Sequence, residues 1–141
     1  MSPVAARLIR ITAAVCLAIS GYLHAYLYDH GYRVIPRVGT AFLFQASASL
    51  AVALLLPFTG LVLLRLTAAG LAGGALVAFV MSRTIGVFGF VEHGLQPAPQ
   101  ALISIIVETA TLFALAVPGV VVLSSTLRRS SAATTTQVGD L

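Results

Sequence analysis

Charged residues are scarce in this chain of 141 residues. Only 9% are Asp, Glu, Lys or Arg, whereas about 25% are charged in ordinary soluble proteins. Hydrophobic residues make up 59% of the chain, and the mean hydropathy is +1.03. This composition excludes a soluble domain. We therefore expect an integral membrane protein.

Lysine is absent and cysteine occurs once. The eight basic residues are all arginines, and most stand singly between apolar runs. They form no basic face, so we expect no nucleic-acid partner despite the net charge of +4. Arginine without lysine, with abundant Ala, Val, Leu and Gly, is typical of a GC-rich bacterial genome. Cys16 alone excludes an intramolecular disulfide and leaves the redox compartment open.

Four apolar runs are long enough to cross a bilayer, which needs about 20 residues. We expect the spans at residues 8–28, 38–56, 61–90 and 100–123, separated by turn-forming Pro and Gly residues. The predicted fold is an all-α membrane protein whose four transmembrane helices form an antiparallel up-down bundle, a single domain over residues 1–124. Residues 125–141 are polar and lack periodicity, which predicts a disordered cytoplasmic tail. Ala18-Ile19-Ser20 imitates a signal-peptide cleavage site, so removal of the first run stays open.

The arginines predict an orientation. With four spans, one side of the membrane holds Arg7, Arg10, Arg65, Arg128 and Arg129, and the other holds Arg33 and Arg37. The positive-inside rule then places both termini in the cytoplasm. We expect a multi-pass protein of the bacterial cytoplasmic (inner) membrane, with the first and third connections facing outward.

One polar residue from each span is predicted to lie in a common layer. These residues are His24, Gln45, Arg83 and Glu108. At about 1.5 Å per residue, Arg83 lies roughly 10 Å before the end of its predicted span, and Glu108 lies roughly 12 Å after the start of the next. Because charges within a bilayer need partners, we predict an ion pair between Arg83 and Glu108. An outer rim is predicted above the layer, at Tyr28, Tyr32, Arg33, Glu92 and His93.

The polar layer fits either of two roles. It can fix the register of the helices, or it can hold an amphiphile such as a quinone or a lipid headgroup. A proton-coupled transporter that uses Glu108 is a further alternative. The chain has no H-E-x-x-H motif, nucleophile elbow or paired metal ligands, so we expect neither a metal nor catalytic residues.

Haem b is the remaining cofactor alternative. It would need axial ligands such as His24, His30 or His93. Only His24 lies well inside a predicted span. We therefore expect no cofactor, with haem bound through His24 as the alternative.

A small-residue motif lies in the third run. Gly70 and Gly74 form a G-x-x-x-G pattern, which allows helices to approach closely. Such patterns also arise by chance in runs rich in Ala and Gly. We expect this motif to pack against another helix of the same chain.

Two blocks combine aromatic, glycine and charged residues. They are HAYLYDHGYRVIPRVGTAFLFQ (His24 to Gln45) and SRTIGVFGFVEHG (Ser82 to Gly94). Both resemble blocks of an uncharacterised family of small four-span membrane proteins that are frequent in actinobacteria, and the likeness covers residues 11–122. The layout is also distantly similar to that of DoxX-like four-helix proteins. The resemblance implies the four-span topology and no catalytic residue.

These observations favour a non-enzymatic role. We expect an accessory or assembly component of a larger envelope or respiratory complex, in contact with the lipid bilayer and other membrane protein subunits. The alternative is a redox, lipid-binding or quinone-binding membrane protein that uses the outward-facing polar layer as its site.

Overall fold

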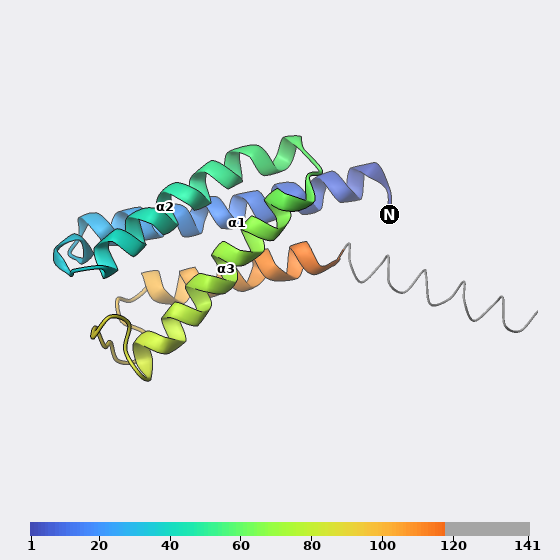
Figure 1. Ribbon diagram of the computed structural model, residues 1–141. Helices are drawn as coiled ribbons and strands as arrows, with labels where there is room; N and C mark the ends of the chain where they lie inside the picture. The colour runs from blue at the N-terminus through green and yellow to red at the C-terminus, as the bar shows by residue number, and fades with distance from the viewer. Residues whose placement is uncertain (118–141) are drawn as a thin grey trace, which may run out of the picture.

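The fold is an all-α arrangement of membrane-length helices, shown by a computed structural model that describes residues 1–117 (Figure 1). Within these residues, four helices are long and apolar enough to span a membrane. They are α1 (Pro3–Asp29), α2 (Val38–Leu55, continued by the short helix η2 at Leu56–Phe58), α3 (Val62–Arg83) and a fourth helix at Gln100–Val117. The predicted four-helix membrane fold is confirmed. The end of the fourth predicted span and the tail at 125–141 lie outside the described residues.

Helix α1 begins earlier than predicted because its first residues carry a strong start signal. The Ser2 side chain accepts a hydrogen bond of 3.1 Å from the backbone N–H of Ala5. Pro3 lies in the first turn, where backbone N–H groups have no partner within the helix. The N–H that proline lacks therefore costs no hydrogen bond. These two residues extend the helix through the N-terminal segment that carries Arg7.

Helices α1 and α2 lie side by side (Figure 1), and they approach closely at Gly21. A Cβ atom placed on Gly21 would lie 3.0 Å from Leu50 Cγ and 3.2 Å from the Ala46 carbonyl oxygen. By contrast, a Cβ on Gly70 or Gly74 would meet no atom within 4 Å among the described residues. The predicted close packing of the G-x-x-x-G motif within the chain is therefore wrong, and Gly21 serves that purpose instead.

The apolar core occupies the half of the bundle near the turn between α2 and α3. Its buried members come from all four helices: Ala13, Ala14, Leu17, Val52, Ala53, Leu56, Ala68, Leu71 and Leu115. In the same half, the Arg65 guanidinium donates a hydrogen bond of 3.2 Å to the Leu115 carbonyl. Apolar contacts hold this half together, and a second pocket of about 330 Å³ lies between α3 and the fourth helix, beside Arg65 and Leu115.

Helix α3 ends at Arg83, so the span predicted over residues 61–90 is wrong in its last part. Three residues just beyond Arg83 have left-handed backbone angles: Gly86 (φ 83°), Phe88 (φ 52°) and Gly89 (φ 82°). A right-handed helix cannot continue through such angles. At Gly86 a side chain would also crowd Val91, because a Cβ there would lie 3.0 Å from its Cγ2. Residues 84–99 consequently form a folded connection instead of two further helical turns.

The close approach at Gly21 generates a stability prediction. We expect Gly21→Ala to lower the stability of the bundle by about 1–3 kcal/mol, because the new methyl group overpacks the contact between α1 and α2. Gly70→Ala is the matched control, and it should be neutral or stabilising because alanine favours a helix over glycine by roughly 0.5–1 kcal/mol. Thermal unfolding in detergent measures both. Equal effects of the two substitutions would contradict the assignment of Gly21 as the contact.

Candidate functional site

A cavity of about 290 Å³ lies in the half of the bundle opposite the apolar core. The four residues of the predicted polar layer all line it: His24 from α1, Gln45 from α2, Arg83 from α3 and Glu108 from the fourth helix. Most of the remaining wall is aromatic or apolar and includes Phe42, Phe44, Ala75, Ala78, Phe79, Phe90, Ala101 and Ile105. The structure therefore brings the four predicted residues to one apolar-walled cavity.

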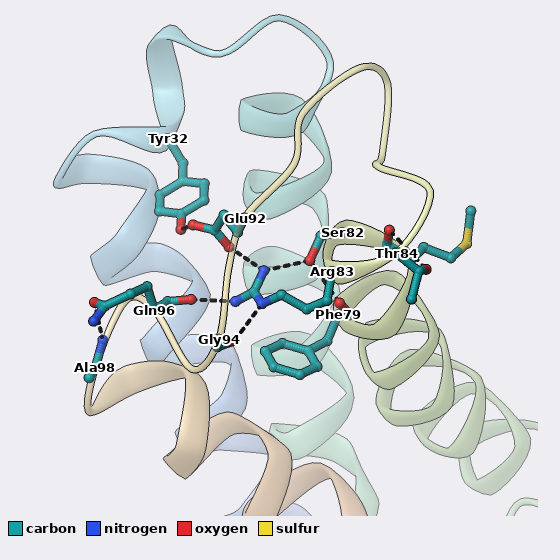
Figure 2. Close-up of polar contacts among 10 residues, drawn as sticks. Tyr32, Phe79, Ser82, Arg83, Thr84, Glu92, Gly94, Gln96 and Ala98 are labelled. Carbon is teal, nitrogen blue, oxygen red and sulfur yellow. Dashed lines mark hydrogen bonds and ion pairs between the residues drawn. The ribbon is translucent and has the colours of Figure 1, made fainter.

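The connection at residues 84–99 folds back over the end of α3 and surrounds Arg83 (Figure 2). The guanidinium donates hydrogen bonds to the carbonyl oxygens of Gly94 (2.8 Å) and Gln96 and to Ser82 Oγ (2.6 Å). It also forms a salt bridge of 2.6 Å with Glu92 Oε2. Four N–H donors of the five on an arginine are thereby occupied.

Glu92 joins this connection to the one between α1 and α2. Its other carboxylate oxygen accepts a hydrogen bond from the Tyr32 hydroxyl, which belongs to the short helix η1 (Tyr32–Val34) (Figure 2). The Tyr32 ring stacks on Phe42 of α2 and meets the edge of Phe90. Burial, together with the hydrogen bond to Glu92, raises the pKa of the Tyr32 phenol above its ordinary value, so the hydroxyl stays a donor. The two connections thus form one cap at the same end of the bundle.

The predicted ion pair between Arg83 and Glu108 is wrong. Within residues 1–117, Arg83 pairs with Glu92, and Glu108 forms no salt bridge. The prediction failed because it placed Arg83 well inside a span that would end at residue 90. Since α3 ends at Arg83 itself, this residue lies about 10 Å nearer the helix end than expected. The connection that follows then reaches it first.

Glu108 lies deeper in the bundle and is only 2% exposed. Its Oε1 accepts hydrogen bonds from Ser20 Oγ (2.9 Å) on α1 and from Ser104 Oγ (2.7 Å) one turn earlier on its own helix. Its Oε2 has no hydrogen-bond donor among the described residues. A buried carboxyl group with one oxygen satisfied therefore borders the cavity.

His24 and Gln45 contact backbone carbonyls instead of each other. The His24 Nδ1 lies 2.9 Å from the Ser20 carbonyl oxygen, so this nitrogen carries a proton, and in the neutral ring Nε2 is then an acceptor. The ring centroid lies 5.1 Å from that of Phe42. Gln45 Nε2 donates to the Leu71 carbonyl at 3.1 Å and ties α2 to α3. Both side chains are held in place while they border the cavity.

The predicted rim residues separate into two groups. Tyr32 and Glu92 line the cavity as part of the cap. Arg33 and His93 are exposed, Tyr28 is half-buried, and Arg33 makes only a long ion pair of 3.7 Å with exposed Asp29. Arg33, His93 and Tyr28 do not border the cavity.

The arrangement offers few ligands to a metal or a haem. Among residues 1–117, no cluster of three His, Cys, Asp or Glu side chains is placed to hold a metal ion. Of the three histidines, His24 alone lines the cavity. His30 is exposed, with its ring stacked on Tyr26. Haem bound through His24 is an untested alternative, and this cavity would supply no second histidine.

Sequence reasoning did not assign the hydrogen-bond partners of Glu108 and Arg83. Ser20 and Ser104 lie four residues from His24 and Glu108 on their helices, and this spacing is the signal that could identify them. The Arg83 carbonyl partners at Gly94 and Gln96 leave no such signal, because a backbone contact depends on the path of the connection.

No protein-family model, curated protein or solved structure matches the chain.

The cap generates a coupling prediction. Arg83→Met and Glu92→Leu should each destabilise the protein by about 3–5 kcal/mol, because each strands a largely buried partner. The double variant should lose less than the sum of the single losses. Detergent thermal unfolding across a double-mutant cycle measures this coupling.

The control is a second cycle of Arg83→Met with Glu108→Gln, in which we expect additive losses because these residues do not touch. Additive losses in the first cycle, or strong coupling in the second, would contradict the charge pairing of the structure.

Proposed function

We propose that the protein binds a small amphiphile inside the membrane, in the cavity between its four helices. One observation carries this proposal: polar side chains from every helix border a cavity of about 290 Å³ whose wall is otherwise apolar. Ligand sites in proteins combine these two properties, with an apolar wall and a few polar groups that fix the orientation of the ligand. Helical bundles build such sites from side chains on facing helices.

The alternative role of the layer, fixation of helix register, fits the same residues less well. Protein interiors are close-packed and contain few voids larger than a water molecule. Two polar contacts do cross between helices, from Ser20 to Glu108 and from Gln45 to the Leu71 carbonyl. Among the described residues, however, the four residues of the layer do not pair with one another, and they border a cavity. The apolar core and the contact at Gly21 already join the helices. The cavity is therefore better explained by a ligand.

The cap supports binding by closing one end of the cavity. Arg83, Glu92 and Tyr32 tie the two connections together and satisfy one another. Because these polar groups already have partners, they form a fixed wall that need not reorganise when a ligand enters. The accessory or assembly role expected from the sequence stays a prediction, and an amphiphile-binding subunit is compatible with it.

Ligand binding predicts a co-purifying molecule. Native mass spectrometry of the protein, extracted in a mild detergent, should show an adduct that survives removal of the micelle. Ala75→Phe should abolish the adduct because the new ring fills the cavity that Ala75 lines. Val77→Phe on the same helix is the matched control, since Val77 is 59% exposed and does not line the cavity. An adduct that persists in Ala75→Phe would exclude this cavity as its site.

We further infer that both termini face the cytoplasm of a bacterial inner membrane, so that the cap faces outward. The support is the arginine count of the sequence, in which four spans put Arg7, Arg10, Arg65, Arg128 and Arg129 on one side, against Arg33, Arg37 and the cap residue Arg83 on the other. The hydrogen bond between Tyr32 and Glu92 supports the same side for both capped connections.

Cysteine labelling in a Cys16→Ser background tests this orientation. Val34→Cys, at a position that is 75% exposed in the first connection, should react with a membrane-impermeant maleimide in intact cells. Gly60→Cys, in the opposite turn and with open space around it, should react only in inverted vesicles. The reverse pattern would place the termini outside.

A further inference from the structure

With Glu108 ionised and the His24 ring neutral, most of the polar groups left available on the cavity wall are hydrogen-bond acceptors. Glu108 uses Oε1 for two serine hydroxyls, and Oε2 has no donor among the described residues. His24 uses Nδ1 for the Ser20 carbonyl, which leaves Nε2 as an acceptor. Gln45 uses one of its two amide N–H groups for the Leu71 carbonyl, and its side-chain oxygen has no donor within residues 1–117. A ligand that satisfies Glu108 Oε2 and His24 Nε2 must therefore offer donors or positive charge.

Arg83, the cationic residue of the cavity, already has hydrogen-bond and ion-pair partners. Arg83 donates to Ser82, Glu92, Gly94 and Gln96, and its guanidinium lies 4.3 Å from the centroid of the Phe79 ring. Figure 2 shows these partners surrounding it within the cap. Four of its five N–H donors are therefore unavailable to an anionic headgroup. A carbonyl ligand such as a quinone would meet acceptors at Glu108 and at His24 Nε2, where it needs donors.

We propose that the cavity binds a lipophilic cation, a protonated amine or quaternary ammonium with an apolar substituent, and that the Glu108 carboxylate is its counter-ion. The inference rests on the proposed function, because it assumes that the cavity is a ligand site and adds the chemical class of the ligand. A carboxylate this deeply buried in a membrane protein requires a partner. The described residues supply only hydroxyl groups, and a bound cation supplies the missing charge.

The wall also suits the rest of such a ligand. Phe42, Phe44 and Phe90 line the cavity together with the ring of Tyr32. Aromatic faces attract ammonium groups, most strongly where water is excluded. The same rings accommodate an apolar substituent. A ligand with its positive charge near Glu108 and its aromatic or alkyl group against these rings therefore contacts both the polar and the apolar parts of the wall.

Two probes of the same shape separate charge from apolar burial. Benzyltrimethylammonium carries the cation, and neopentylbenzene is its neutral isostere with carbon in place of nitrogen. Isothermal titration of the detergent-solubilised full chain at neutral pH should show benzyltrimethylammonium binding at least about tenfold more tightly, as expected for an interaction with a buried charge. This comparison uses the wild-type protein and needs no variant.

Substitution of Glu108 then locates the effect. Glu108→Gln keeps the size of the side chain and should weaken cation binding by about tenfold or more while leaving the neutral probe unchanged. Asp29→Asn is the control, because it removes a carboxylate that is 70% exposed at the same end of the bundle. This control should bind both probes as the wild type does. Thermal unfolding of each variant verifies that it is folded.

The outcomes distinguish this inference from the proposed function. Equal binding of the two probes, or cation binding that Glu108→Gln does not alter in a folded protein, would overturn the cation inference and leave an amphiphile site. Failure of both probes to bind, together with an absence of any co-purifying adduct, would overturn the proposed function as well. Preferential cation binding that is lost only in Glu108→Gln supports the inference.

Discussion

The capture of Arg83 by the connection that follows it is the interaction on which the cavity depends. A guanidinium at the end of a membrane helix needs several acceptors, and residues 84–99 supply them through Glu92 and through the carbonyls of Gly94 and Gln96. To reach Arg83 the connection must reverse direction, and it does so at Gly86 and Gly89. The reversal closes the end of the bundle. Without it, the polar wall below would open directly to the membrane surface.

One half of the bundle contains the apolar core that stabilises the fold, and the other half contains the cavity. Near the turn between α2 and α3, Leu17, Leu56 and Ala68 are fully buried and pack like any apolar core. At Gly21 the backbones of α1 and α2 come close enough to exclude a side chain. Nearer the cap, α3 runs obliquely to α1 and α2 (Figure 1), and side chains as small as Ala75 and Ala78 face the cavity. The packed half can hold the helices together while the other half keeps its cavity.

The sequence alone predicted the four membrane-length helices of the described residues and the four polar-layer residues that line the cavity, because these follow from apolar run length and from one polar residue in each run. It did not predict which charges meet. Helix ends are the least certain feature of a sequence prediction, and here the end of α3 decides the partner of Arg83. The apolar residues from Ile85 to Phe90 read as a continued span, whereas Gly86 and Gly89 take left-handed angles. Glycines inside an apolar run are compatible with both outcomes, so only the folded connection distinguishes them.

The pairing of Arg83 with Glu92 instead of Glu108 changes the chemistry of the whole cavity. Had it paired with Glu108, the layer would be neutral and internally satisfied, and it would need nothing beyond the chain. With Arg83 held by Glu92 in the cap, the carboxyl group of Glu108 remains below it with hydroxyl partners only. A buried acid without a cation gains from a positively charged ligand more than from any neutral one. The same event that closes the cap therefore determines the sign of the charge that the site favours.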